Sequence, residues 1–246
     1  MSQVRVERQP GYLLHTRPYR DSSALLEVWS PEFGRVGLVA RGARRAKSPW
    51  RGVLESFQPL WLSWAGKGEL KTLREVEPER LVTPPTGAAL AAAYYVNELI
   101  LRTCMRQDPH PRLYTDYVTL LEILVTQPQF EASLRYFEKR LLSELGYGLE
   151  LSGDCQGAPL RADKDYRYVA DQGAVPANRQ TDGSGEIVAG DLLIALAGER
   201  LSEQQLDDAK RLMRQLLRPH LGNRPLESRR LWKIYSKIGK GSETRD

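Results

Sequence analysis

Short apolar segments separated by turn-forming residues dominate the first 80 residues of the chain. An open sheet of such segments would leave unpaired strand edges, whereas a closed barrel leaves none. The pattern therefore predicts a small five-stranded barrel, either the OB-fold or an SH3-like barrel with a similar strand count. Five segments are rich in Leu, Val, Trp and Tyr and are bounded by Pro, Gly, Asp or Ser, as strands are: Gly11–Tyr19, Ala24–Ser30, Arg35–Arg41, Phe57–Trp64 and Leu70–Val76.

The pattern changes to helical spacing after Pro84 and Pro85. Three segments predict a helical domain: Ala88–Arg106, Leu113–Thr126 and Phe130–Leu145. In the third, Leu134, Phe137 and Leu141 fall on one side, and Gly146 is a common helix stop.

Residues 150–187 contain much Gly, Asp, Pro and Ser with sparse apolar spacing, which predicts an irregular or weakly β segment that is loosely held. Helices are expected again at Gly190–Ala197, Leu206–Leu221 and Ser228–Ile238. The expected fold is α+β: a five-stranded barrel, OB-fold or SH3-like, over residues 1–80, a mainly helical domain over 81–149, and a remainder over 150–246. That remainder joins the irregular insertion to basic helices that pack on the helical domain.

Composition describes an ordinary globular protein, with 41% hydrophobic and 27% charged residues. The net charge of +5 hides an uneven distribution. Residues 1–80 carry 14 basic and 9 acidic side chains, residues 81–209 carry 11 and 19, and residues 210–240 carry 10 and 1. Two basic regions flanking an acidic one favour a polyanionic partner. The longest apolar run, near residues 88–96, is too short to span a bilayer, so we expect a cytoplasmic protein with no membrane partner.

A basic loop follows the third expected strand and contains no acidic residue. Guanidinium and ammonium groups on a β scaffold suit the phosphates of single-stranded nucleic acid. Trp50 lies within the loop and either stacks on an unpaired base or caps the barrel core. The candidate DNA contacts here are Arg35, Arg41, Arg44, Arg45, Lys47, Trp50 and Arg51.

A second basic region lies near the C-terminus. Lys210, Arg214 and Arg218 recur every four residues and form one helical stripe, and Arg229 and Lys233 repeat this spacing beside Arg230. Like charges stacked in this way repel each other unless an anionic partner neutralises them. These six residues are therefore further DNA-contact candidates, the alternative being a solvated helix face.

Catalysis has little support in the sequence. The motifs GxxxxGK[ST], HExxH and G-x-S-x-G are absent, and the three histidines stand apart. Asp163 and Asp165 suggest the start of a nuclease metal site but have no third ligand at a defined spacing. We therefore expect a protein that is not an enzyme and has no cofactor. A basic OB-fold protein bound to RNA or ribosomes is the alternative within the binding class.

Several blocks of the sequence resemble the RecO family of bacterial recombination mediators. These are TRPYRDSSALLEVWS, GRVGLVARGARRAKS, FQPLWLSWAGKGELKTL, YYVNELILR, LRYFEKRLLSELGYGLEL and LRPHLGNRPLESRRLW. The resemblance runs from about Gly11 to Trp232. It implies an N-terminal OB-fold and a central helical domain. Members that bind zinc carry four cysteines after the LGY block, whereas Cys155 stands alone here, so the resemblance is to a zinc-less variant.

The resemblance also implies partners. Family members bind single- and double-stranded DNA, anneal strands coated with single-stranded DNA-binding protein (SSB), and with RecR help to load RecA. Arg135 occupies the family position that contacts the acidic, apolar tail of SSB. Lys139, one helical turn away, extends that site in our interpretation. The resemblance thus implies a bacterial, nucleoid-associated protein of DNA repair.

Overall fold

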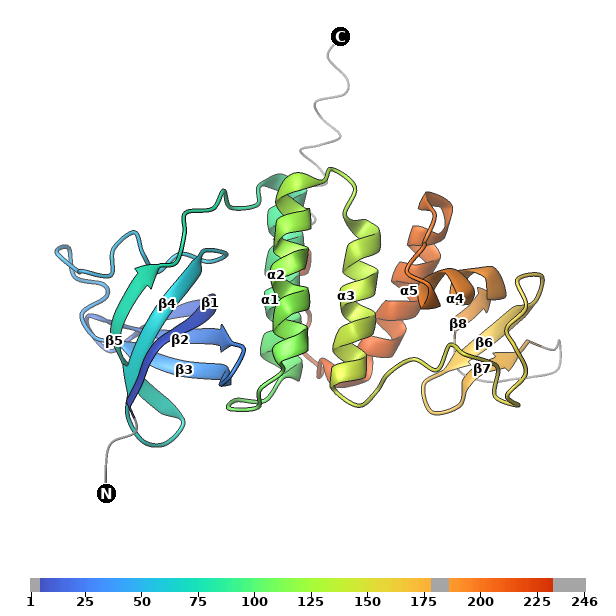
Figure 1. Cartoon of the computed structure of the whole chain (residues 1–246), viewed down its shortest axis with the longest axis horizontal. Coiled ribbons are helices and arrows are strands. Elements are labelled where there is room, and N and C mark those ends of the chain that lie inside the picture. Colours follow the sequence, from blue (N-terminus) through green and yellow to red (C-terminus); the bar gives the residue numbers. More distant parts are fainter. Residues whose placement is uncertain (1–4, 178–185, 232–246) are drawn as a thin grey trace, which may run out of the picture. The chain divides into compact units, whose positions relative to one another are not determined.

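The computed structural model describes residues 5–177 and 186–231. The described chain forms two compact units (Figure 1). The first takes in the chain up to Pro128 and again from Arg224, and the second is Gln129–Asn223. The second unit is therefore an insertion in the chain of the first.

The first unit begins with a closed five-stranded barrel in the order β1-β2-β3-β5-β4. Neighbouring strands pair antiparallel, except that β3 pairs parallel with β5. This arrangement confirms the predicted OB-fold within an α+β protein. The strands are β1 (Arg5–Tyr19), β2 (Ser23–Ser30), β3 (Gly34–Ala40), β4 (Pro59–Ala65) and β5 (Leu70–Pro78).

The barrel core consists of the inward-facing side chains of its strands. Leu26, Leu38 and Leu62 are fully buried and pack in one cluster with Trp64. Trp61 lies three residues from Trp64, on the opposite face of the strand, and is only partly buried, beneath the Arg8 guanidinium at 5.3 Å. The alternation of side chains along a strand explains this division.

Two helices complete the first unit, α1 (Gly87–Thr103) and α2 (Pro111–Thr126). The buried Asn97 of α1 donates to the Leu14 carbonyl oxygen at 3.0 Å and accepts from the Tyr117 hydroxyl of α2 at 2.9 Å. A buried amide with both ends paired fixes α1 to the barrel and to α2 at once.

The turn after α1 returns to the start of β3. The Gln107 N–H donates to the Arg35 carbonyl oxygen at 3.0 Å. Gly34 has φ +61°, and a Cβ there would lie 2.0 Å from the Asp108 carbonyl oxygen, so only glycine allows this approach. Arg35 forms an ion pair with Glu27 at 3.4 Å and donates to the Leu101 carbonyl, while Arg106 joins the same carboxylate.

The second unit contains helices and a small sheet. Its described residues form a three-stranded antiparallel sheet in the order β7-β6-β8, and α5 packs on α3. The elements are α3 (Glu131–Glu144), β6 (Asp165–Val169), β7 (Gly173–Pro176), β8 (Glu186–Ala189), α4 (Gly190–Ala197), η1 (Glu203–Gln205), α5 (Leu206–Leu217) and η2 (Arg218–His220).

The described part of residues 150–187 contains the short strands β6 and β7, in agreement with the weakly β alternative, but its residues are packed rather than loosely held. Tyr166 and Tyr168 of β6 are each 1% exposed, and Ala174 of β7 is fully buried. The Tyr168 hydroxyl donates to the Glu150 carbonyl oxygen at 3.3 Å. Packing and hydrogen bonds of this small sheet therefore hold the segment. The predicted domain limits at residues 80 and 149 stay a prediction.

Candidate nucleic-acid interface

The basic loop between β3 and β4 is held by hydrogen bonds rather than extending freely. The Arg44 N–H donates to the Ser22 carbonyl oxygen at 2.9 Å, and its guanidinium donates to the Arg20 carbonyl oxygen at 3.3 Å. Both contacts fasten the loop to the β1–β2 turn. Five of the predicted cations are exposed on this loop: Arg41, Arg44, Arg45, Lys47 and Arg51.

Trp50 is the structural anchor of the loop. Its indole Nε1 donates to the Arg41 carbonyl oxygen at 3.1 Å, and its partly buried ring packs against the barrel core together with Val53 and Leu54. This placement favours barrel capping, one of the two roles that the sequence left open. Stacking of Trp50 on a base stays a prediction.

A groove of about 370 Å³ opens beside the loop. It lies between the β1–β2 turn, the end of β3 and the start of β5, and none of its lining residues is acidic. Loops at this position of an OB-fold are where oligonucleotides bind. Four cations line the groove: Arg20, Arg41, Arg45 and Lys71.

Sequence reasoning missed part of this groove. Lys71 reaches it because β5 pairs parallel with β3, with Lys71 opposite Leu38, a neighbour relation that no local pattern shows. Arg20 has φ +52° in the tight turn after β1, and its guanidinium lies 5.2 Å from the Tyr19 ring centroid. The sequence did contain one indication for Arg20: it is a basic residue in the turn between two apolar strands.

Arg35 differs from the other loop cations. Its side chain is only 16% exposed and faces Glu27. Burial lowers the pKa of the Arg35 guanidinium, although the Glu27 carboxylate acts against this. Arg35 thus lies at the contact between β3 and α1, where it donates to the Leu101 carbonyl. Its contact with DNA stays a prediction, and one that this placement does not favour.

The cations near the C-terminus fall on both units. Lys210 and Arg214 on α5 and Arg218 at the start of η2 are exposed and recur every four residues. The described segment of the first unit that begins at Arg224 exposes Arg229 and Arg230. Lys233 lies outside the described residues.

The two carboxylates considered for metal chemistry lie at the start of β6 and just before it. Asp163 forms an ion pair with Arg161 at 2.7 Å, and hydrogen bonding from Arg161 lowers the pKa of its carboxyl. Asp165 begins β6, opposite Ala189 of β8. Within residues 5–177 and 186–231, no three His, Cys, Asp or Glu side chains gather as a metal site would require. No helix in these ranges has the length and hydropathy needed to cross a membrane.

Comparison with known proteins assigns the chain to a family. Residues 1–82 match the family model "Recombination protein O N terminal", and residues 84–230 match "Recombination protein O C terminal". The DNA repair protein RecO of Alkalilimnicola ehrlichii is 46% identical over 239 residues, covering 95% of this chain and 93% of that protein. The chain belongs to the RecO family. The RecO protein of Dechloromonas aromatica is 41% identical, with 93% and 96% covered.

The RecO models divide the chain differently from its compact units. The boundary between the two models lies between the end of β5 at Pro78 and the start of α1 at Gly87. The C-terminal RecO model therefore includes α1 and α2, which pack with the barrel, as well as the whole second unit.

The two residues predicted to bind the SSB tail are engaged within the second unit. Arg135 is 8% exposed and forms an ion pair with the fully buried Glu138 at 2.9 Å. Lys139 donates to the Leu196 carbonyl oxygen at 3.0 Å and forms an ion pair with Glu199 at 3.0 Å. A peptide carboxylate that binds either cation must therefore displace an existing partner, or share the cation with it.

Proposed function

We propose that this chain is a recombination mediator of bacterial DNA repair. In this proposal it binds single- and double-stranded DNA in the cytoplasm, at the nucleoid. It anneals complementary strands coated with SSB and, with RecR, assists the loading of RecA. Membership of the RecO family supports the role in DNA repair. The observation that carries the proposal is the groove of the OB-fold, lined by four cations and no carboxylate.

Annealing gives a physical reason for more than one cationic surface. Two strands repel each other through their phosphates, and their bases must remain accessible to pair. Contacts to phosphate reduce the repulsion and leave the base edges free. In this proposal the groove holds one strand, and the stripe of Lys210, Arg214 and Arg218 along α5 and the start of η2 holds another. Base pairing and counterion release supply the free energy, so no catalytic step is required.

The proposal is tested by annealing two complementary oligonucleotides coated with SSB, comparing intact SSB with SSB that lacks its tail. We expect the protein to accelerate annealing with intact SSB and to lose most of this effect without the tail. Equal rates with and without the protein, for both forms of SSB, would contradict the mediator role. Tighter binding to structured RNA than to single-stranded DNA would favour an RNA-associated protein instead.

Binding of the SSB tail is expected to depend on α3. Replacing Arg135 alone would remove the Arg135 ion pair from the fully buried Glu138 carboxylate, so the informative variant is Arg135→Met with Glu138→Gln. We expect roughly 5- to 20-fold weaker binding of a labelled peptide carrying the SSB tail, because a buried charge-assisted contact is lost. Fluorescence anisotropy measures this affinity.

Affinity for naked DNA serves as the control for that variant, because neither residue lines the groove of the OB-fold. Glu138→Gln alone retains the arginine and removes the carboxylate that competes for it, so it is expected to bind the peptide at least as tightly as the unmodified protein. Equal losses for peptide and DNA would show that the double change disturbs the fold, and would remove the support for an α3 site.

A further inference from the structure

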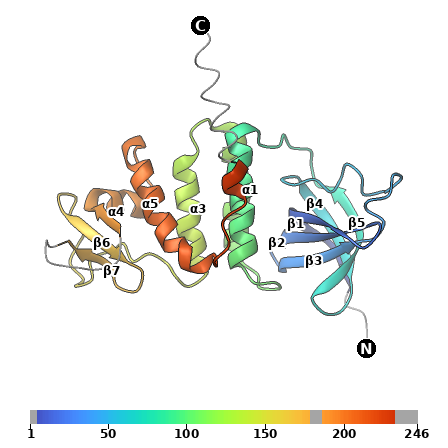
Figure 2. The same ribbon diagram turned by 180° about the vertical axis from the view of Figure 1, so that it is seen from behind.

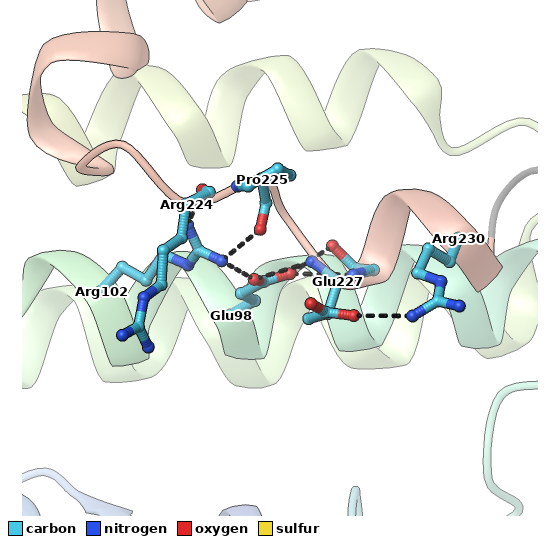
Figure 3. Close-up of polar contacts among 7 residues, drawn as sticks. Glu98, Arg102, Arg224, Pro225, Glu227 and Arg230 are labelled. Carbon is cyan, nitrogen blue, oxygen red and sulfur yellow. Dashed lines mark hydrogen bonds and ion pairs between the residues drawn. The ribbon is translucent and has the colours of Figure 1, made fainter.

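The segment after the second unit is clamped onto α1 by two side chains of that helix. The Glu98 carboxylate accepts hydrogen bonds from the Glu227 N–H at 3.0 Å, the Ser228 N–H at 2.9 Å and the Ser228 hydroxyl at 2.7 Å (Figure 3). Arg102, one turn along α1, forms an ion pair with Glu98 and donates to the Pro225 carbonyl oxygen at 2.7 Å and to the Arg224 carbonyl. The clamp thus binds backbone groups of the returning chain.

The clamp sets where a helix starts. Residues 228–231 are helical, and Glu98 accepts from the N–H groups at its beginning, which have no partner within the helix. Burial acts to raise the pKa of the Glu98 carboxyl, but the hydrogen bonds from Ser228 and Glu227 and the charge of Arg102 lower it by more. Glu98 is therefore ionised at neutral pH, as a cap for a helix N-terminus should be.

The clamped segment keeps its apolar side inward and its charges outward. Leu226 is 6% exposed and Ser228 is 5% exposed, whereas Arg224, Arg229 and Arg230 are exposed. The Arg224 side chain runs away from the Glu98 carboxylate (Figure 3), and Figure 2 shows the segment lying along α1. The ion pair of Arg230 with Glu227, at 3.6 Å between side chains about four-fifths exposed, contributes little.

We infer that Glu98 is a positioning residue for nucleic-acid binding: it fixes Arg224, Arg229 and Arg230 on α1 as a second phosphate-contacting surface of the unit that carries the OB-fold groove. This inference rests on the proposed function. Loose cations at the end of a chain contact phosphate only after losing conformational freedom, whereas clamped ones have already lost it. The Glu98 carboxylate thus promotes binding of a polyanion through the position of the arginines, although its own negative charge repels phosphate.

The test compares Glu98→Ala with Glu122→Ala, which removes an exposed carboxylate of α2 in the same unit, one that pairs with Arg80. Simple electrostatics predicts that both changes slightly strengthen binding to a single-stranded oligonucleotide. We expect Glu98→Ala instead to weaken oligonucleotide binding by roughly 3- to 10-fold. The slope of log affinity against log salt should also fall, by the equivalent of about two phosphate contacts. Amide hydrogen exchange in residues 224–231 should rise in the same variant and stay unchanged in Glu122→Ala.

A variant that leaves the clamp intact keeps the test independent of folding. Changing Arg224, Arg229 and Arg230 to Ser should reproduce the loss of affinity without faster exchange. Full affinity in this variant would overturn the inference, as would unchanged exchange in Glu98→Ala or equal affinities of Glu98→Ala and Glu122→Ala. If changes in the groove also left affinity unaltered, the proposed function itself would fail. If the changes in the groove weakened binding, the proposed function would stand and only the inference about Glu98 would fail.

Discussion

Changing Arg41, Arg45 and Lys71 together to Gln is expected to lower affinity for a single-stranded oligonucleotide by roughly 10- to 100-fold at about 0.1 M salt. All three line the groove of the OB-fold, and no acidic residue there already balances their charge. The slope of log affinity against log salt should fall by about 2, because each lost phosphate contact removes about 0.7. Fluorescence anisotropy across a salt series measures both quantities.

A matched control removes the same charge elsewhere on the first unit. Arg5, Arg74 and Arg112 are exposed and do not line the groove. Their replacement by Gln should reduce affinity only slightly, through the smaller net charge. Equal losses in the two variants would show that the protein binds DNA through its overall charge, and the groove would then not be the binding site.

Glu27→Gln is expected to lower the free energy of unfolding of the first unit by about 3–5 kcal/mol. The Glu27 side chain is 13% exposed and pairs with both Arg35 and Arg106. The change would leave the mostly buried Arg35 without this carboxylate, and Arg106 with the exposed Glu69 at 3.5 Å. Urea unfolding followed by tryptophan fluorescence measures the effect, because Trp29 and Trp64 are buried in this unit. Glu75→Gln, at an exposed strand position, should change stability by less than about 0.5 kcal/mol.

A double variant separates loss of the ion pair from general damage. Adding Arg35→Met to Glu27→Gln removes one cation that the first change leaves without its partner, and should recover part of the lost stability. If Glu27→Gln cost no more than Glu75→Gln, the network would not hold the barrel to α1. DNA affinity of the folded protein should change little, because none of these residues lines the groove.

The barrel could be predicted from sequence because its apolar strands are bounded by turn residues. The ends of elements were harder. The structure starts β1 at Arg5 rather than Gly11, since its first residues pair with β4 through their backbone across a register shift between Val6 and Gln9. Helix α1 ends at Thr103 rather than Arg106 because the following turn packs on Gly34, a contact distant in the sequence.

The small sheet of the second unit was predictable only in outline. Tyr166 and Tyr168 are large aromatic residues in an otherwise polar segment of the sequence, and both are buried in β6. Their partners β7 and β8 are four residues each, too short for alternation to indicate a strand.

Charge patterns located the basic loop but could not sort its members. Arg35 and Arg41 look alike in the sequence, yet Arg35 meets a carboxylate from β2 and Arg41 faces the groove. Arg135 was likewise chosen from its position in a motif, whereas its ion pair with Glu138 depends on how α3 is buried. Which cation meets a carboxylate is decided by packing between elements, which local sequence does not contain.

The insertion of the second unit also affects synthesis of the protein. The barrel, α1 and α2 leave the ribosome early, but Glu98 and Arg102 meet their partners only after residues 129–223 have been translated. At about 5–20 residues per second this delay is roughly 5–20 s. During that interval Glu98 and Arg102 on α1 cannot yet form their hydrogen bonds with the backbone of Pro225, Glu227 and Ser228. The contacts of Glu98 and Arg102 with residues 224–228 can therefore form only after the inserted unit has been synthesised.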